Sequence, residues 1–69
     1  MLRRYDDCLG HCVCYADAET GLVEHRIGKV TTRTHIAMGE TYTIEKEGTV
    51  TVLRRTGISE LQATSYFKP

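Results

Sequence analysis

The sequence predicts an all-β fold, a small five-stranded antiparallel barrel. Glycines at positions 10, 21, 28, 39, 48 and 57 divide the chain at intervals of seven to eleven residues. The segments between them are rich in β-branched and aromatic residues. Short strands with turn signals at this spacing are typical of small sandwiches and barrels. Two of the segments also have the pattern of hairpins of one design, and together they supply four of the five strands.

Residues 1–8 have Leu2 and Tyr5 as their main apolar anchors, so we expect a tail or one helical turn that caps a barrel formed by residues 9–69. A chain of 69 residues has room for one domain and buries only about 60% of the surface that its unfolded form exposes. From Leu9 to Ala16 the sequence is apolar on both faces of an extended chain. This pattern predicts a central strand that is buried on both sides.

The first hairpin is predicted around a three-residue turn, Glu19–Gly21. With that turn, Val13 lies opposite Ile27 and Tyr15 lies opposite His25. A partly buried His25 bonded to a neighbour is the expected arrangement.

Gly28 follows the second strand of this hairpin. A glycine inside a strand-like run often marks a bulge or a sharp bend. We therefore expect a barrel corner at Gly28, after which Val30–His35 continues as a polar extended segment.

The second hairpin, Gly39–Gly57, is the segment that the sequence defines best. A three-residue turn at Lys46–Gly48 sets Ile44 opposite Val50 on one apolar face. The other face is then expected to be open to water or to a partner, and it carries Thr41, Thr43, Thr51 and Leu53.

Residues 58–67 admit two interpretations. Ser59 and Gln62 have the spacing of a capping box, which would begin a short helix. Leu61, Ala63, Ser65 and Phe67 instead alternate with polar residues, which favours a turn at Ile58–Glu60 and a closing strand. The strand is the preferred prediction.

With these elements the chain resembles SH3-like and Sm-like small barrels. The stretch VTVLRRTGISEL, residues 50–61, is similar to the closing pattern of WYL-type and Rof-type barrels, although the Trp-Tyr-Leu signature is absent. In those barrels a basic strand precedes an isoleucine that plugs the core, and Arg54, Arg55 and Ile58 hold these places here. The resemblance implies a regulatory binding module.

The sequence contains no nucleophile elbow, no phosphate-binding glycine loop and no HExxH motif, so we expect no enzyme and no cofactor. The formal net charge is zero, which argues against a strongly electrostatic binder of nucleic acid or membrane. We therefore predict a non-enzymatic regulatory or adaptor module that binds a protein partner and could form a homo-oligomer. Its expected binding residues are Arg54, Arg55, Thr41, Thr43, Thr51 and Leu53.

Binding of single-stranded nucleic acid is the main alternative, because small barrels use basic grooves and stacked aromatic side chains for this purpose. The residues that could form such a surface are Arg26, Lys29, Arg33, Tyr42 and Tyr66.

Zinc binding is a weaker alternative that rests on Cys8, Cys12 and Cys14. On a strand, Cys12 and Cys14 point to one face and His11 points to the other, so this segment cannot supply a tetrahedral site alone. Buried, reduced thiols are the expected state. The absence of a signal-peptide core and of an apolar run of about 20 residues leads us to expect a cytoplasmic protein.

Overall fold

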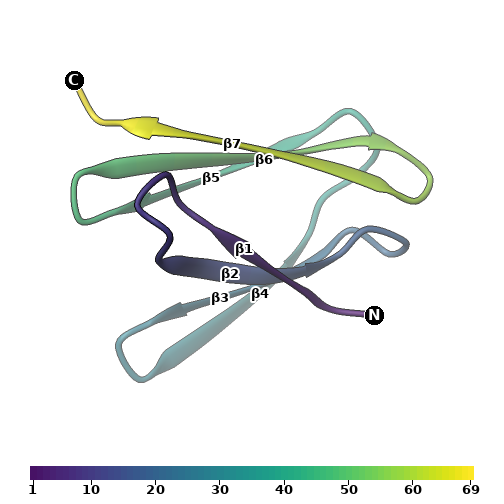
Figure 1. Cartoon of the computed structure of the whole chain (residues 1–69). Helices are drawn as coiled ribbons and strands as arrows, with labels where there is room; N and C mark the ends of the chain where they lie inside the picture. The colour runs from purple at the N-terminus through teal and green to yellow at the C-terminus, as the bar shows by residue number, and fades with distance from the viewer.

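The computed structural model describes residues 1–69 as seven strands without a helix. The strands are β1 (Arg3–Asp6), β2 (Cys12–Asp17), β3 (Leu22–Ile27), β4 (Val30–His35), β5 (Thr41–Lys46), β6 (Thr49–Gly57) and β7 (Glu60–Phe67). They form two antiparallel sheets with the orders β1-β2-β3-β4 and β5-β6-β7. Figure 1 shows the two sheets stacked on each other, with the β4–β5 linker passing between them. The all-β prediction is therefore confirmed.

The hydrophobic core lies between the two sheets. Its buried members are Val13, Cys14, Ala16, Val23, Ile36, Ile44 and Leu53. The first four come from β2 and β3, Ile36 comes from the linker, and the last two come from β5 and β6. Each sheet therefore needs the other to bury its apolar face.

The predicted five-stranded barrel is wrong, because no strand pairing closes the sheets: β4 does not pair with β5, and β7 does not pair with β1. Gly28 is not a bend within a strand. It begins a two-residue turn that reverses the chain from β3 into β4, with Ile27 paired to Val30. Its φ is 61°, and a positive φ at the first turn position alone is typical of a type II′ hairpin turn. At the N-terminus, Arg3–Asp6 forms β1 where the sequence predicted a tail or a helical turn.

The turn of the β5–β6 hairpin has two residues, so the predicted three-residue turn is wrong. Lys46 pairs with Thr49, and the turn residues Glu47 and Gly48 have φ values of 48° and 82°. Two positive φ values define a type I′ turn, whose twist matches that of the strands it joins. The shift of one residue reverses the faces of β6: Thr51 and Leu53, expected on the open face, are fully buried.

Buried hydroxyl groups on this face are hydrogen-bonded, which makes the register possible. The Thr49 hydroxyl lies 2.7 Å from the Lys46 carbonyl oxygen and 3.2 Å from Asp7 Oδ2. Thr51 donates to Ser65 Oγ at 3.2 Å, and Ser65 Oγ also accepts the Cys8 backbone N–H at 2.9 Å. A buried polar group with a partner avoids the desolvation penalty that would exclude it from a core.

The β2–β3 hairpin also has a different turn from the predicted one. Asp17 pairs with Leu22, which leaves a four-residue turn, and Tyr15 lies opposite Glu24 instead of His25. The Asp17 carboxylate accepts the Glu19 backbone N–H at 2.9 Å. This side-chain bond holds the longer turn, as aspartate commonly does at the start of turns.

The prediction of a central strand at Leu9–Ala16 is confirmed in part by β2, which lies between β1 and β3. Tyr5 pairs with Cys14 and Asp6 pairs with Cys12, so Val13 is the extra residue of a bulge. Val13 and Cys14 are both buried although they are adjacent. A bulge breaks the strict alternation of a strand and thereby allows this.

The C-terminal segment forms β7, so the preferred strand prediction is confirmed and the alternative helix is wrong. Ile58, however, lies in the β6–β7 turn with 73% of its surface exposed. It does not plug a core as the resemblance to WYL-type and Rof-type barrels implied. No segment forms a helix of the length and apolarity that spanning a bilayer would require.

Candidate binding cleft

The strands β2 and β3 separate at one end of the first sheet. They pair only where Tyr15–Asp17 faces Leu22–Glu24, whereas β3 stays paired with β4 as far as Ile27. Beyond Glu24, β3 therefore leaves β2 and follows β4. We call the opening between residues 12–14 of β2 and residues 25–27 of β3 the fork cleft.

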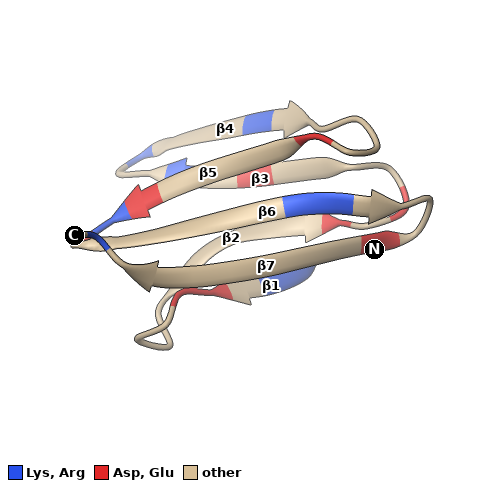
Figure 2. Ribbon diagram, turned by 90° about the horizontal axis from the view of Figure 1, so that it is seen from above, with Lys and Arg blue, Asp and Glu red and all other residues tan.

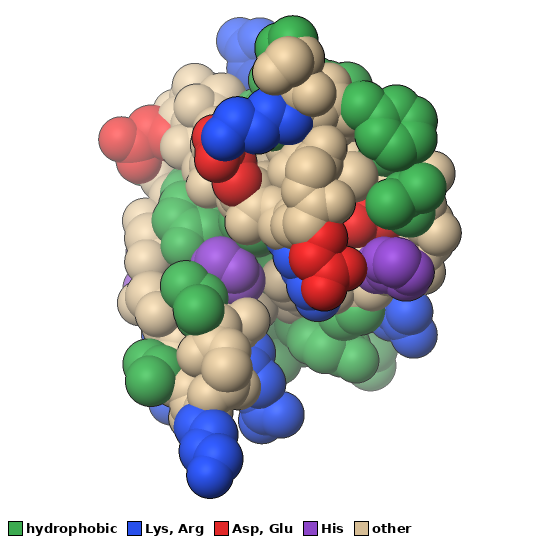
Figure 3. All heavy atoms as spheres, turned by 90° about the vertical axis from the view of Figure 1, so that its left-hand side faces the viewer, with side chains coloured by type: hydrophobic (Ala, Val, Ile, Leu, Met, Phe, Trp, Pro, Cys, Tyr) green, Lys and Arg blue, Asp and Glu red, His purple; other side chains and the backbone are tan.

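The fork cleft has a volume of about 860 Å³. Its walls are Cys12–Tyr15, Glu24–Gly28, Thr31 and Arg33 of the first sheet, together with Glu45 and Lys46 of β5. Figure 3 views the molecule from this end, where the β3–β4 hairpin projects from the body. Figure 2 shows that β4 lies outside the edge of β5, so the second sheet does not cover β4.

Apolar side chains form part of the wall. Val13 and Cys14 are buried, and they contribute to both the core and the cleft. Ile27 is 64% exposed on the β3 side of the opening. Val30, its partner across the turn, is 65% exposed but does not line the cleft. The two residues thus have equal exposure and different positions relative to the cleft.

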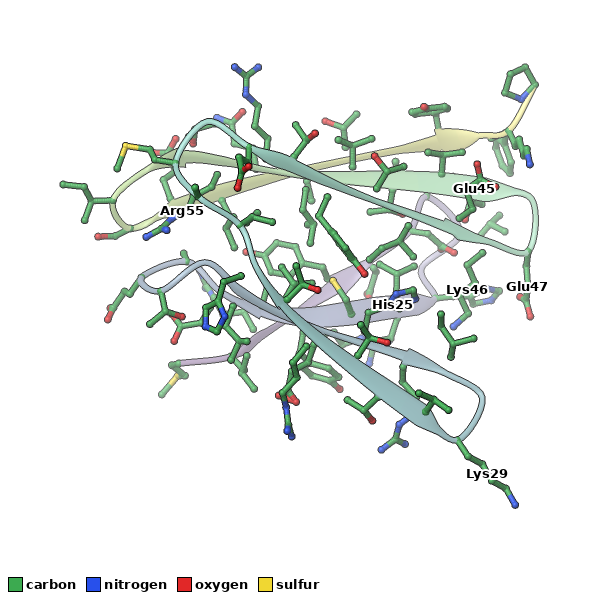
Figure 4. The ribbon with its side chains drawn as sticks, turned by 180° about the vertical axis from the view of Figure 1, so that it is seen from behind. His25, Lys29, Glu45, Lys46, Glu47 and Arg55 are labelled. Carbon is green, nitrogen blue, oxygen red and sulfur yellow. The ribbon has the colours of Figure 1, made fainter.

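His25 lies half-buried between the cleft and the core. Its ring meets the ring of Tyr42 edge to face, with centroids 6.3 Å apart and planes at 78°. Burial lowers the pKa of His25 below its ordinary value, and the positive charge of Lys46 lowers it further. In Figure 4, His25 and Lys46 lie close together at the end of the molecule opposite to Arg55. The imidazole is therefore held in its neutral form more readily than a free histidine.

This shift predicts a fall in stability below neutral pH. Because the pKa of His25 is lower in the folded chain, the unfolded chain binds the proton first as pH falls through the ordinary value of 6.5. The free energy of unfolding should then decrease until the folded pKa is passed. Urea denaturation between about pH 7 and pH 5 should show this decrease. It should shrink in His25→Gln but persist in the control His35→Gln, which changes an exposed histidine. An equal decrease in wild type and His25→Gln would contradict the assignment.

Lys46 connects the second sheet to the open edge of β2. Its ammonium donates a hydrogen bond to the Cys12 carbonyl oxygen at 2.9 Å. Three other charged groups of the lining are ion-paired: Arg33 lies 3.5 Å from Glu24, and Glu45 lies 3.0 Å from Lys68, which is outside the cleft. Lys46 itself forms no such ion pair.

The structure does not bring the predicted protein-binding residues together. Thr41, Thr43 and Arg54 are exposed, whereas Thr51 and Leu53 are buried. The Arg55 guanidinium is bonded to the backbone, where it donates to the carbonyl oxygens of Glu19 at 2.9 Å, Ile36 at 3.2 Å and Ile58 at 3.3 Å. Its donors hold the β2–β3 turn, the linker and the β6–β7 turn to one another.

The basic residues of the nucleic-acid alternative do gather, but the aromatic ones do not. Arg26, Lys29 and Arg33 all lie on the β3–β4 hairpin, and Lys29 is at its tip (Figure 4). Tyr42 packs against the core, and Tyr66 is on β7 in the other sheet. A continuous surface of these five residues is therefore absent.

The three cysteines occupy different environments. Cys8 is exposed, Cys12 is half-buried and Cys14 is buried. Burial raises the pKa of the Cys14 thiol to about 12, so it stays protonated. No three histidine, cysteine, aspartate or glutamate side chains are arranged to hold a metal ion.

Sequence reasoning missed the roles of Ile27 and Lys46. One signal was available at residues 27–30, Ile-Gly-Lys-Val, where two aliphatic residues flank a Gly-X pair. That pattern predicts a two-residue hairpin turn, and hence an additional strand that leaves the barrel. Comparison of the chain with family models, with curated proteins and with solved structures gives no match.

Proposed function

We propose that this protein is a non-enzymatic interaction module that binds an extended segment of a partner protein in the fork cleft. The observation that supports this is the divergence of β2 and β3 after Glu24, which leaves a strand edge on each side of the opening. Extended peptides add to free strand edges because their main-chain N–H and C=O groups complete the ladder. Pockets for alternate side chains then provide specificity.

The cleft offers both unpaired strand edges and surface for side chains of a ligand. Residues 12–14 and 25–27 have no ladder partner across the opening, and unpaired backbone groups are costly once water is excluded. Ile27, which is 64% exposed, provides apolar surface for a side chain of the entering segment, whereas Val13 lines the opening but is buried. A regulatory or adaptor role, homo-oligomerisation and a cytoplasmic location remain proposals drawn from the sequence.

Replacement of Ile27 by serine should weaken binding to the cleft by about tenfold, because an aliphatic contact with the ligand is lost. The probe is a displayed library of random peptides, selected on the wild-type protein, with individual peptides then measured by fluorescence anisotropy. Val30→Ser is the matched control, since Val30 has the same exposure across the same turn but does not line the cleft. It should leave affinity unchanged.

Hydrogen exchange gives a second readout of the same proposal. Amide protons of residues 12–14 and 25–27 should exchange more slowly when a selected peptide is bound, because strand addition protects the edges that it covers. Selected peptides that bind both serine variants equally, and protect none of these amides, would refute the proposal. A library from which no binder can be selected would count against it too.

A further inference from the structure

We infer that the ligand of the fork cleft is an acidic extended peptide, whose carboxylates pair with Arg26, Lys29 and Lys46. This inference rests on the proposed function and specifies the chemistry of the partner. It follows from the distribution of charge around the cleft, from the position of the Lys46 ammonium and from the unpaired strand edges.

The charges around the cleft do not balance. Both of its carboxylates already have cationic partners, Glu24 with Arg33 and Glu45 with Lys68. Arg26 lines the cleft without an ion pair or a side-chain hydrogen bond, and Lys29 stands unpaired at the tip of the adjoining hairpin (Figure 4). Lys46 adds a third positive charge without a carboxylate. Oppositely charged groups on a partner would neutralise this excess and exclude basic partners.

Lys46 occupies the position that a backbone donor of a paired strand would take. Its ammonium donates to the Cys12 carbonyl oxygen at 2.9 Å, on the part of β2 that no longer pairs with β3. The N–H of an entering strand can replace that donor, because it forms the same kind of hydrogen bond. The displaced ammonium would then be free to pair with a carboxylate of the ligand. An acidic peptide therefore supplies a partner for both the Cys12 carbonyl oxygen and the Lys46 ammonium, whereas a neutral peptide supplies one only for the carbonyl oxygen.

The cleft favours a peptide over a nucleic acid. Single-stranded nucleic acids bind through successive bases stacked on aromatic side chains, but Tyr15 is the one tyrosine that lines the cleft. The features of the lining that can bind a partner are the strand edges, the aliphatic side chain of Ile27, and the unpaired cations Arg26 and Lys46. The main chain of an entering peptide would pair with the strand edges. Its alternate aliphatic and acidic side chains would contact the aliphatic side chain and the cations of the cleft.

The test uses three labelled ten-residue peptides in which valine alternates with glutamate, with glutamine or with lysine. Fluorescence anisotropy at low salt should show the glutamate peptide binding about tenfold more tightly than the glutamine peptide, and the lysine peptide should bind weakest. Added salt should remove most of the difference, because exposed charges are screened. Arg26→Glu should weaken binding of the glutamate peptide by about fivefold or more and improve binding of the lysine peptide.

Arg54→Glu is the matched control. Arg54 is also an exposed strand arginine without an ion pair, but it lies on β6 away from the cleft. It should leave all three affinities unchanged. If glutamate and glutamine peptides bind equally and protect the cleft amides, the acidic ligand is refuted and the proposed function is kept. If no peptide binds or protects these amides, both are refuted. Tighter binding of a thymidine oligonucleotide, lost in Arg26→Glu, would replace the peptide with a nucleic acid.

Discussion

Replacement of Leu53 by alanine is expected to lower the free energy of unfolding by about 2–5 kcal/mol. Leu53 is fully buried in the middle of β6, where it pairs with Tyr42 of β5 and Ala63 of β7. The substitution removes a large apolar side chain from a core of seven buried residues and leaves a cavity that the surrounding strands cannot fill. A domain of this size has a stability of about 3–10 kcal/mol. The substitution should therefore remove a large part of the total stability and lower the midpoint of unfolding.

Urea denaturation followed by circular dichroism measures this effect. The control is Ile58→Ala, because Ile58 is 73% exposed in the β6–β7 turn and should change stability by no more than about 0.5 kcal/mol. Equal losses in the two variants would contradict the register of β6, since a strand shifted by one residue would place Val52 inside and Leu53 outside.

Replacement of Gly21 by alanine is expected to cost about 2–4 kcal/mol. Two causes combine at this position. The φ of Gly21 is 80°, which is unfavourable for a residue with a side chain, and a Cβ atom there would lie 2.3 Å from the carbonyl oxygen of Ile36. That carbonyl accepts a hydrogen bond from Arg55, so it cannot move aside without disturbing the junction of the β2–β3 turn with the linker.

Gly48→Ala separates the two causes. Gly48 has a φ of 82°, but a Cβ atom there would meet no neighbour within 4 Å. Alanine at position 48 should therefore cost only the backbone strain, about 1–2 kcal/mol. The difference between the two variants in urea denaturation measures the steric conflict. A Gly21→Ala variant as stable as Gly48→Ala would show that the turn and the linker are not in contact.

The sequence was sufficient to predict an all-β fold, the central position of β2 and a closing strand after the turn at Ile58–Glu60. These predictions depend on local composition and alternation, which respond directly to burial on one or two faces. Whether the strands close into a barrel could not be predicted in the same way. It depends on whether β4 and β5 pair, and the turn at Gly28 and Lys29 sends β4 away from the second sheet.

Both hairpin registers were mispredicted, each for its own physical reason. The assumption that threonine faces water excluded a β5–β6 register that buries Thr49 and Thr51. Their hydroxyl groups find partners in Asp7 and Ser65, residues far away in the sequence that a hairpin considered alone cannot reveal. In the β2–β3 hairpin, the carboxylate of Asp17 supports a longer turn than the glycine position suggested.

The cleft could be predicted only in part. Arg26, Lys29 and Arg33 were identified as one basic group, and all three lie on the β3–β4 hairpin. The cleft itself arises because β3 pairs longer with β4 than with β2. That difference in pairing length is a property of the whole sheet, and no single residue encodes it.

The connectivity of the two sheets has a consequence for the order of folding. Every strand pairs only with strands that precede or follow it directly in the chain, so each hairpin closes a short loop at a small entropic cost. The segments that form the two sheets are consecutive halves of the chain, joined by the linker between His35 and Thr41. Residues far apart in the sequence therefore need to come into contact only when the two sheets pack together. We therefore expect the formation of the shared core to be the slow event, with pairing of the strands ahead of it.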